Sequence, residues 1–416
     1  MSKEKRRVPK LRFPGFTEDW EQCKLGSIGS TYTGLSGKTK EDFGHGEAQY
    51  ITYLNVFQNT VSDITMTDKV EIDTTQNEVK YGDVLFTTSS ETPEEVGMSS
   101  VWLGHTPNIY LNSFCFGFRP NQKIDPYFLG YSLRAPYMRD KIKILAQGIS
   151  RYNISKNKVM ELEISLPNNE EQSLLGIFLR NIDLDITLHQ RKLDNLKLKK
   201  KALLQKLFPK NGERYPELRF PGFTDAWEQR KLGDLLILLK DGSHGTHKNT
   251  DAGVYLLSAK NIKNGRINIM PDDRIISWDD YNVIHKNYEL QIGDILLTIV
   301  GSIGETAIFN LKTKVTFQRS VAFLRPNSNL NNGFLYTLIN TDRFQNQLQT
   351  KQVVSAQPGI YLGDLATIDI TYPKNILEQE KIYNIFREIE NSITLHQRKL
   401  DHLQLQKKAL LQQMFV

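Results

Sequence analysis

The sequence predicts an α+β fold in which two similar mixed α/β domains are joined by two long antiparallel coiled-coil helices with pseudo-two-fold symmetry. Two duplicated segments support this prediction. Residues 9–26 (PKLRFPGFTEDWEQCKLG) return at 216–233 (PELRFPGFTDAWEQRKLG) with 14 of 18 positions identical, and residues 186–208 return at 393–415 with 18 of 23 identical. Both copies lie 207 residues apart, so the chain is a tandem duplication whose halves have kept the same length. The intervening sequence has diverged, which predicts a constant frame that presents two different surfaces.

The first element of each half is a domain, predicted at residues 9–165 and 216–372. Both domains contain short β-type segments, such as Val84–Thr88 and Ile295–Val300, separated by glycine, asparagine and aspartate. The two domains are therefore expected to share a mixed α+β fold and to differ in their loops. Weak correspondences between them are residues 81–85 (YGDVL) with 292–296 (IGDIL), 118–120 (FRP) with 324–326 (LRP), and 147–149 (QGI) with 357–360 (QPGI).

The second element of each half is a long helix, predicted at residues 166–210 and 373–416. Each helix begins after a proline, Pro167 or Pro373, and has a Glu-Gln pair in its first turns. Steps of four and three residues give the apolar pattern of a coiled coil, and about 40 residues correspond to roughly 60 Å of helix. The expected seam comprises Ile182, Ile186, His189, Leu193, Leu196, Leu203 and Leu207 in the first helix, and Ile389, Ile393, His396, Leu400, Leu403, Leu410 and Met414 in the second.

Polar residues interrupt this seam at the same two places in both copies: His189 and His396 at one, Lys200 and Lys407 at the other. A polar residue that fixes the register of a coiled coil is a more common reason for a seam histidine than a metal site. We therefore expect the histidines to be structural.

The composition indicates a folded intracellular protein. With 416 residues, the chain is long enough for two domains and connecting helices. Cys23 and Cys115 do not suggest a disulfide framework, and they favour a reducing cytosol. The first ten residues, MSKEKRRVPK, contain no apolar stretch of a secretory signal, and the longest apolar run, Leu235–Leu239, is too short to span a bilayer. We expect a cytoplasmic protein with no membrane role.

The net charge of +6 modestly favours a nucleic-acid partner. The first predicted helix carries much of the positive charge. Three of its lysines are replaced by glutamine in the second copy: Lys197, Lys199 and Lys206 become Gln404, Gln406 and Gln413. Either a solvated helix face, or a face near phosphates or an acidic partner, explains this pattern.

The sequence contains no recognisable active-site motif. Residues 36–39 (SGKT) match the end of a phosphate-binding loop, but Tyr32 stands where that motif needs a glycine. There is no GxGxxG turn and no Asn- or Asp-Pro-Pro-Tyr methyltransferase motif. His244 and His247 lack a second ligand cluster for a metal, and the acidic residues around Asp272 lack the lysine of a nuclease site. These observations predict a binding protein that holds no metal or cofactor of its own.

The duplicated opening LRFPGF-x3-WEQ-x-KLG, the Gly-Asp pair followed by residues 301–304 (GSIG), the Glu-Gln helix start and the helix ending in KKALLQ resemble the specificity subunits of type I restriction-modification systems. Each motif alone is weak, but their duplicated order is specific and covers essentially the whole chain. The resemblance implies that each domain is a target-recognition domain that reads one half of a bipartite, asymmetric target in double-stranded DNA. It also implies that the helices set the gap between the half-sites.

The same resemblance implies partners for the chain. Methyltransferase (modification) subunits, two of them, would dock on the constant frame, and restriction/translocase subunits would join them. The chain would then direct adenine methylation or restriction without catalysing either reaction. S-adenosylmethionine, ATP and magnesium are expected in the partner subunits, and none of them in this chain.

Candidate DNA-binding residues lie where cationic, aromatic and amide side chains gather in loops. Arginine can pair with guanine and glutamine or asparagine with adenine, while lysines neutralise phosphates. The first domain offers Ser36, Lys38, Lys40, Arg151, Tyr152, Asn153, Lys156 and Lys158, and the second offers Ser243, His244, Thr246, His247, Lys248, Arg319 and Gln357.

Two other functions remain open at this stage. An enzyme that modifies or cuts DNA alone is disfavoured by the missing motifs. A structural coiled-coil adaptor with two protein-binding domains is the second alternative, and salt-sensitive, sequence-selective DNA binding would exclude it.

Overall fold

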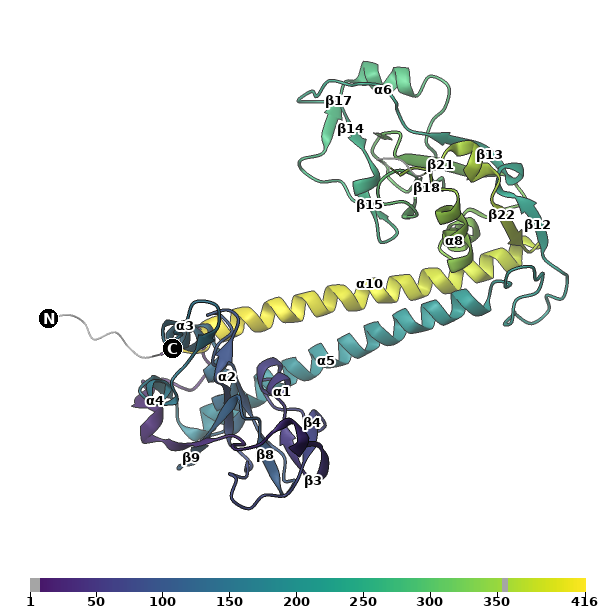
Figure 1. Cartoon of the computed structure of the whole chain (residues 1–416). Helices are drawn as coiled ribbons and strands as arrows, with labels where there is room; N and C mark the ends of the chain where they lie inside the picture. The colour runs from purple at the N-terminus through teal and green to yellow at the C-terminus, as the bar shows by residue number, and fades with distance from the viewer. Residues whose placement is uncertain (1–7, 354–357) are drawn as a thin grey trace. The chain divides into compact units, whose positions relative to one another are not determined.

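The computed structural model describes residues 8–353 and 358–416, and the chain divides into two compact units (Figure 1). Unit 1 consists of the residues up to Arg191 together with Gln397–Val416, and unit 2 consists of Lys192–His396. The two long helices, α5 (Asn169–Lys206) and α10 (Ile376–Gln413), each contribute residues to both units. Each unit is therefore assembled with help from the other half of the sequence.

Unit 1 is built on a four-stranded antiparallel sheet in the order β2-β9-β5-β7. A three-stranded sheet has the order β4-β3-β8, with β3 and β8 parallel, and β1 pairs with β11. The strands are β1 (Glu21–Lys24), β2 (Gly29–Thr33), β3 (Phe43–Ile51), β4 (Thr67–Val70), β5 (Val84–Thr87), β6 (Ser89–Ser90), β7 (Ser99–Val101), β8 (Ile109–Leu111), β9 (Cys115–Pro120), β10 (Tyr152–Asn153) and β11 (Glu163–Leu166). The short helices are α1 (Tyr53–Gln58), α2 (Pro126–Arg134), α3 (Pro136–Ile144) and α4 (Lys156–Met160).

Unit 2 repeats this topology. Its four-stranded sheet has the order β13-β21-β18-β19, its three-stranded sheet the order β17-β14-β20, and β12 pairs with β22. The strands are β12 (Glu228–Lys231), β13 (Leu236–Asp241), β14 (Val254–Leu257), β15 (Ile262–Lys263), β16 (Arg266–Ile267), β17 (Arg274–Ile276), β18 (Ile295–Thr298), β19 (Thr306–Ile308), β20 (Val315–Phe317), β21 (Val321–Pro326) and β22 (Asp369–Tyr372). The helices are α6 (Trp278–Ile284), α7 (Asn332–Ile339), α8 (Asp342–Thr350) and α9 (Leu362–Ala366). The expectation of two similar mixed domains joined by helices is confirmed.

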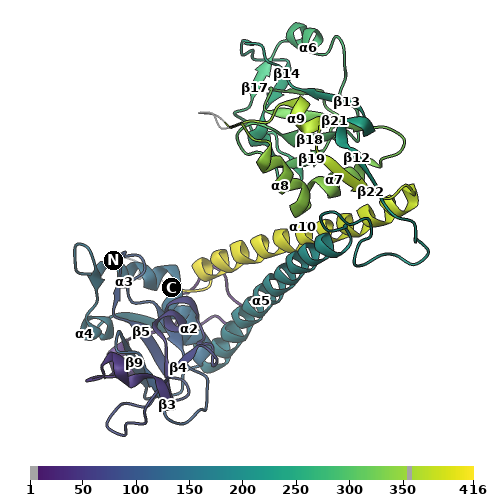
Figure 2. The ribbon, with the colours of Figure 1, turned by 45° about the vertical axis from the view of Figure 1, so that its right-hand side comes forward.

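The central strands β5 (VLFT) and β18 (ILLT) show why these segments form strands. Every residue of both is buried, which suits an uninterrupted run of β-branched and large apolar side chains. In unit 2, α7 lies between the strands of the four-stranded sheet and α10 (Figure 2). Phe334 of α7 and Phe386 of α10 belong to the same buried cluster.

The copied Glu-Gln pair joins each long helix to its unit. Glu171 accepts two hydrogen bonds from Arg12, at 2.7 and 2.8 Å, and Glu378 accepts two from Arg219, at 2.8 and 2.9 Å. The bond to Glu171 raises the pKa of Arg12. Both glutamates are buried, so loss of either arginine would leave an uncompensated charge at a cost of about 3–5 kcal/mol.

The adjacent glutamines hold the start of α2 and α7. Gln172 accepts the N–H of Asp125, the residue that caps α2, at 3.0 Å. Gln379 accepts the N–H of Asn331, which caps α7, at 2.7 Å. The Glu-Gln motif is therefore a connector between the constant helix and the domain, as well as a helix start.

The helices pack antiparallel within each unit, and the seam lysines are part of that packing. In unit 1, Lys407 of α10 contacts Asp183 of α5 at 2.6 Å, and the hydroxyl of Tyr131 donates to the same carboxylate at 2.7 Å. In unit 2, Lys200 of α5 contacts Glu390 of α10 at 2.7 Å, beside the hydroxyl of Tyr336. The two ion pairs are related by the duplication, since Lys200 and Lys407, like Asp183 and Glu390, are 207 residues apart.

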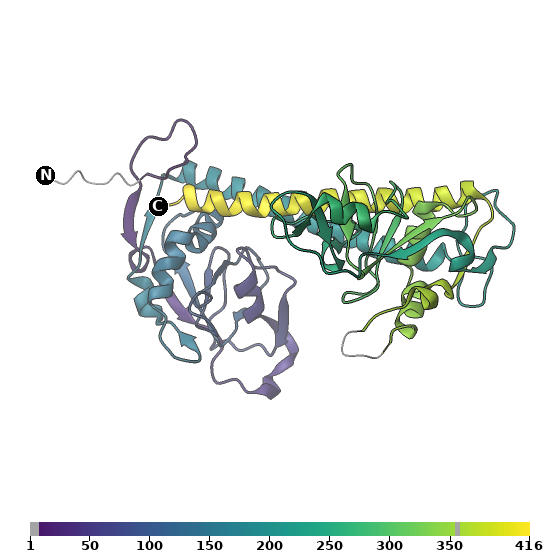
Figure 3. The same ribbon diagram turned by 90° about the horizontal axis from the view of Figure 1, so that it is seen from above.

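A phenylalanine beyond the end of each long helix completes one core. The C-terminus of the chain lies beside the strands and helices of unit 1 (Figure 3). Phe415, after α10, packs against Trp20 and Phe128 of unit 1, with ring centroids 6.3 and 5.7 Å away. Phe208, after α5, packs against Trp227 of unit 2 at 5.9 Å. The tryptophans come from the copied LRFPGF segments, so the constant parts of the sequence meet in the two cores.

Candidate nucleic-acid interface

Three loops adjoin one end of the four-stranded sheet of unit 1: residues 34–40 after β2, residues 112–114 before β9, and residues 147–154, which are bonded to Thr88 after β5. Backbone hydrogen bonds join them. The N–H of Gly34 donates to Cys115 at 3.3 Å, that of Thr88 to Phe114 at 3.0 Å, and that of Ile154 to Thr88 at 3.0 Å. We call these residues the three-loop face of unit 1.

Unit 2 has a corresponding three-loop face, formed by residues 242–248, 318–320 and 358–360. The N–H of Gly242 donates to Val321 at 3.0 Å, that of Ile299 to Ser320 at 2.9 Å, and that of Ile360 to Ile299 at 2.9 Å. The backbone bonds are equivalent to those of unit 1, while the side chains differ. The two loops chosen from composition, residues 36–40 and 243–248, thus occupy matching positions.

In the first loop of unit 1, some of the predicted residues are bonded within the protein and others are exposed to solvent. Lys38 forms an ion pair with Asp73 at 2.8 Å, and the N–H of Ser36 donates to Gln76 at 3.0 Å. The bond from Lys38 lowers the pKa of Asp73 well below its usual range. Lys40 is exposed.

The third loop of unit 1 presents Arg151 next to an exposed ring. The guanidinium of Arg151 lies 6.0 Å from the centroid of Phe114, which is 55% exposed. Tyr152 is half-buried and pairs with β6, and Asn153 is exposed. Two further candidates lie in α4, where Lys156 is half-buried and Lys158 exposed.

The first loop of unit 2 is held by a chain of side chains. His247 Nε2 lies 2.6 Å from Ser243 Oγ, and its Nδ1 lies 3.1 Å from Asp280 Oδ1. His244 Nε2 lies 2.7 Å from Asp241 Oδ2.

Other candidates in unit 2 lie around the same loop. Thr246 and Lys248 are exposed. Arg319, also exposed, donates its N–H to the carbonyl of Ser243 at 3.0 Å, so the structure brings it to this loop. Gln357 lies outside the described residues.

Phe114 is the residue of this face that the sequence reasoning missed. The sequence feature that could have indicated Phe114 is an aromatic residue in the polar turn Asn112-Ser113-Phe114 between two apolar strands. An exposed aromatic ring beside an arginine is a common platform for nucleobases and deoxyribose.

An ion pair in the four-stranded sheet explains two of the weak sequence correspondences. Arg119 contacts Asp83 at 2.7 and 2.8 Å, and Arg325 contacts Asp294 at 2.7 and 2.8 Å. Each arginine also donates to the carbonyl five residues before its aspartate. Hydrogen bonds to the aspartates raise the pKa of both arginines. These pairs fix the sheet that carries the loops.

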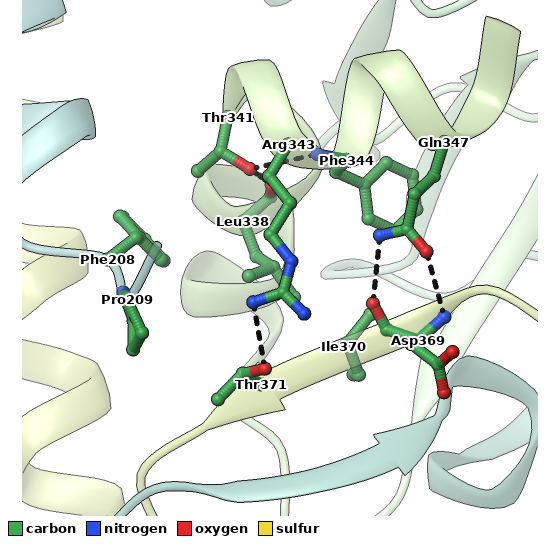
Figure 4. Close-up of a pocket in the computed structure, with 10 residues that line it drawn as sticks. All are labelled: Phe208, Pro209, Leu338, Thr341, Arg343, Phe344, Gln347, Asp369, Ile370 and Thr371. Carbon is green, nitrogen blue, oxygen red and sulfur yellow. Dashed lines mark hydrogen bonds between the residues drawn. The ribbon is translucent and has the colours of Figure 1, made fainter. Parts of the chain in front are cut away.

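A small cavity of unit 2 has a structural role. It has a volume of about 20 Å³, which corresponds to roughly one water molecule. Figure 4 shows Gln347 bonded to both backbone groups of Asp369, at 3.0 and 3.2 Å, and Arg343 bonded to Thr371 at 3.1 Å. Burial lowers the pKa of Arg343. The bonds join α8 to β22.

The described residues contain neither a cluster of metal ligands nor a membrane-spanning helix. Across residues 8–353 and 358–416, no three His, Cys, Asp or Glu side chains are grouped so that they would hold a metal ion. Within the same residues, no helix has the length and apolar character needed to cross a bilayer.

The comparisons with known proteins identify the family. The family model for the type I restriction modification DNA specificity domain matches residues 17–198 and again residues 224–405. The two matches are 207 residues apart and together cover most of the chain. The protein belongs to this family: it is a DNA specificity subunit, the non-catalytic recognition component of a type I restriction-modification complex. The resemblance read from the sequence is confirmed.

Relatives match along almost the whole chain. A Methanocaldococcus jannaschii protein named as the specificity subunit of type I restriction enzyme MjaX is 24% identical over 413 residues, covering 95% of this chain and 92% of the relative. The MjaVIII specificity subunit of the same organism is 22% identical over 418 residues, covering 96% and 92%.

Solved structures share the fold. The S subunit of a type I restriction-modification system from M. genitalium has a TM-score of 0.57 at 16% identity and covers 98% of this chain and 99% of its own. A chain from a structure concerning complex assembly and conformational transition of the type I R-M system has a TM-score of 0.51 at 18% identity, covering 97% and 98%.

Proposed function

We propose that the three-loop faces are the surfaces with which this specificity subunit reads DNA, one half-site per face. The observation that carries the proposal is the equivalent backbone scaffold of the two faces with different side chains on each. Two unlike surfaces of this kind recognise an asymmetric, bipartite target. In domain terms, residues 9–165 and 216–372 are the recognition domains, and 166–210 and 373–416 are the frame helices.

The exposed cations of the faces and of α4, which follows the third loop of unit 1, are suited to phosphates and bases. Lys40, Lys158 and Lys248 carry charge that is not tied to a neighbouring acid within the described contacts, and such lysines supply affinity that falls with salt. Arg151 and Arg319 are suited to guanine, which each bidentate arginine distinguishes by about 1–3 kcal/mol. The proposed contacts on the same faces also include Ser36, Tyr152, Asn153, His244 and Thr246, with Lys156 in α4 beside them. Gln357, outside the described residues, stays a prediction from the sequence alone.

The frame offers two equivalent docking sites for methyltransferase subunits. Leu188 and Leu405 belong to unit 1, and their duplicates Leu395 and Leu198 belong to unit 2; all four are 64–68% exposed. Large apolar side chains kept in both copies at exposed positions of a helix fit a surface that a partner covers. Two equivalent surfaces accommodate two copies of one subunit. S-adenosylmethionine would be held by those subunits, and ATP and magnesium by restriction subunits, in the cytoplasm beside the chromosome.

The docking sites are tested by the composition of the complex. The double substitution Leu188→Glu and Leu405→Glu should leave one methyltransferase subunit bound where the native chain binds two, as measured by mass photometry. Leu184→Glu, a substitution of an exposed leucine whose duplicate position is Asn391, is the matched control. Two subunits on the double variant would contradict the proposal.

The central experiment maps methylation in cells. The chain is co-expressed with the methyltransferase subunit of its own system, and methylated adenines are located across the genome. A split, asymmetric motif that appears only with the chain supports the proposed function and gives both half-sites. No new methylation from an assembled complex would favour the structural adaptor instead.

The gap between the half-sites is the second readout of this map. We expect the frame helices to set it, because an α-helix fixes 1.5 Å per residue over its length. A four-residue insertion into α5, about one turn, should therefore widen the gap. An unchanged gap would contradict this role.

A further inference from the structure

The first loop of each face is anchored to an aspartate that lies outside the face. In unit 1, Asp73 follows β4 and holds Lys38, and in unit 2, Asp280 in α6 follows β17 and holds His247. The strands β4 and β17 occupy equivalent edges of the three-stranded sheets. The two aspartates are 207 residues apart, the interval of the duplication.

In unit 2, the anchor fixes the tautomer of His247. The ionised carboxylate of Asp280 only accepts, so Nδ1 of the ring donates to it, and Nε2 then accepts the hydroxyl of Ser243. This order of groups also occurs in hydrolase triads. Here, however, Ser243 Oγ also accepts the N–H of Gly245 at 3.2 Å, so the hydroxyl is bonded to the backbone of its own loop.

Two further contacts hold the same loop from β17. Arg274 donates to the carbonyl of His247 and, at 2.8 Å, to the side chain of Asn249. The side chain of His247 is only 9% exposed, whereas its neighbours Thr246 and Lys248 are exposed. His247 therefore faces the protein, and the residues on either side of it face solvent.

In unit 1, the anchor uses different residues. Asp73 holds Lys38 and also accepts a bond from Gln76 at 3.2 Å. Gln76 in turn accepts the N–H of Ser36 at 3.0 Å and donates to its carbonyl at 3.2 Å. The loop is fixed through both its backbone and its lysine, and Lys40 is left exposed.

We propose that Asp73 and Asp280 are positioning residues for DNA recognition, each of which orders the first loop of one face and so controls the reading of one half-site. Lys38 and His247 then act as braces within the protein, and Lys40, Thr246 and Lys248 are the loop side chains presented to DNA. A loop that is ordered before binding loses less conformational entropy on binding, which is why removal of the anchor weakens specific recognition. This inference rests on the proposed function.

The test uses the full methyltransferase complex and the DNA target obtained from the methylation map. Binding is measured to duplexes with both half-sites intact, with either half-site scrambled, and with both scrambled. Asp280→Asn should weaken binding to the intact target by about tenfold, the size expected for one charge-assisted bond. It should leave binding unchanged when one particular half-site is already scrambled. Asp73→Asn should give the same pattern for the other half-site.

Asp279→Asn is the matched control, because Asp279 is adjacent, exposed and carries the same charge. It should change binding by less than about twofold on all four duplexes. Ser243→Ala removes only the outer link of the network and should weaken the same half-site as Asp280→Asn by about threefold. This milder variant keeps the test valid if Asp280→Asn does not fold.

Three results would overturn the inference. They are equal effects of Asp280→Asn and Asp279→Asn, an equal loss of binding to all four duplexes, or the same half-site affected by Asp73→Asn and Asp280→Asn. If the native complex itself shows no selectivity between duplexes, the proposed function fails. If the native complex is selective and the variants retain full selectivity, only the anchoring role fails.

Discussion

Phe415 and Phe208 form a matched pair for testing how the two units are held together. Each is at least 94% buried and each contacts a tryptophan of a copied segment. Replacing a buried phenylalanine by alanine costs about 3–5 kcal/mol, of which each edge-to-face aromatic contact supplies about 0.5–1.5 kcal/mol. Because Phe415 lies in the core of unit 1 and Phe208 in that of unit 2, each substitution should destabilise one unit.

Hydrogen exchange read by mass spectrometry separates the two effects. Phe415→Ala should speed the exchange of core amides in β5 and β9 by roughly 10²–10³-fold, the factor that corresponds to about 3–4 kcal/mol. Amides of β18 and β21 should be unaffected. Phe208→Ala should give the reverse pattern. Equal acceleration in both units after either substitution, or protection unchanged in both, would refute the assignment of one helix end to each core.

Three other predictions concern charges. Asp183→Lys should destabilise unit 1 by about 2–3 kcal/mol, because it places a cation beside Lys407 and removes the acceptor of the Tyr131 hydroxyl. The double variant Asp183→Lys with Lys407→Asp restores an ion pair, so it should regain most of the protection against hydrogen exchange that the single variant loses. The pKa of Asp73 is lowered from 3.8, chiefly by the bond from Lys38, so this anchor should be complete above about pH 4 and should be lost as the pH falls through the lowered value. Loss of protection against hydrogen exchange in residues 34–40 already between pH 8 and 5 would contradict this. Lys40→Ala should weaken binding to specific and scrambled DNA alike and reduce the slope of log K against log salt by about one, whereas a loss confined to one sequence would assign it a base contact.

The frame of this protein can be recognised in its sequence because each of its segments is present in two copies. The repeated segments predicted two similar domains, and the periodicity of apolar residues predicted the two long helices. The interruptions at Lys200 and Lys407 were visible too, but their partners were not. Asp183 is 224 residues from Lys407, and only the antiparallel packing brings the two side chains together.

The loops that we propose to contact DNA were selected from the sequence, but the direction of their side chains was not predictable from it. Composition alone selected residues 36–40 and 243–248, which the structure places in the loops that follow the equivalent strands β2 and β13. It did not show that Lys38 and His247 turn toward acids 35 and 33 residues further along the chain. Local composition reveals that a loop is polar, but the direction of each side chain depends on tertiary neighbours. Phe114 was overlooked for the same reason, because exposure of an aromatic ring is a property of the fold.

The division of the sequence between the units has a consequence for biosynthesis. Unit 1 needs residues 397–416, including Phe415, which a ribosome makes after all of unit 2. Since domains fold as they are completed during synthesis, unit 2 can fold first, and unit 1 can fold only after residues 397–416 are translated. A nascent chain interrupted before residue 397 would therefore carry an unfinished first domain, open to proteases and chaperones. Degradation of such truncated chains would prevent the formation of subunits that recognise only one half-site.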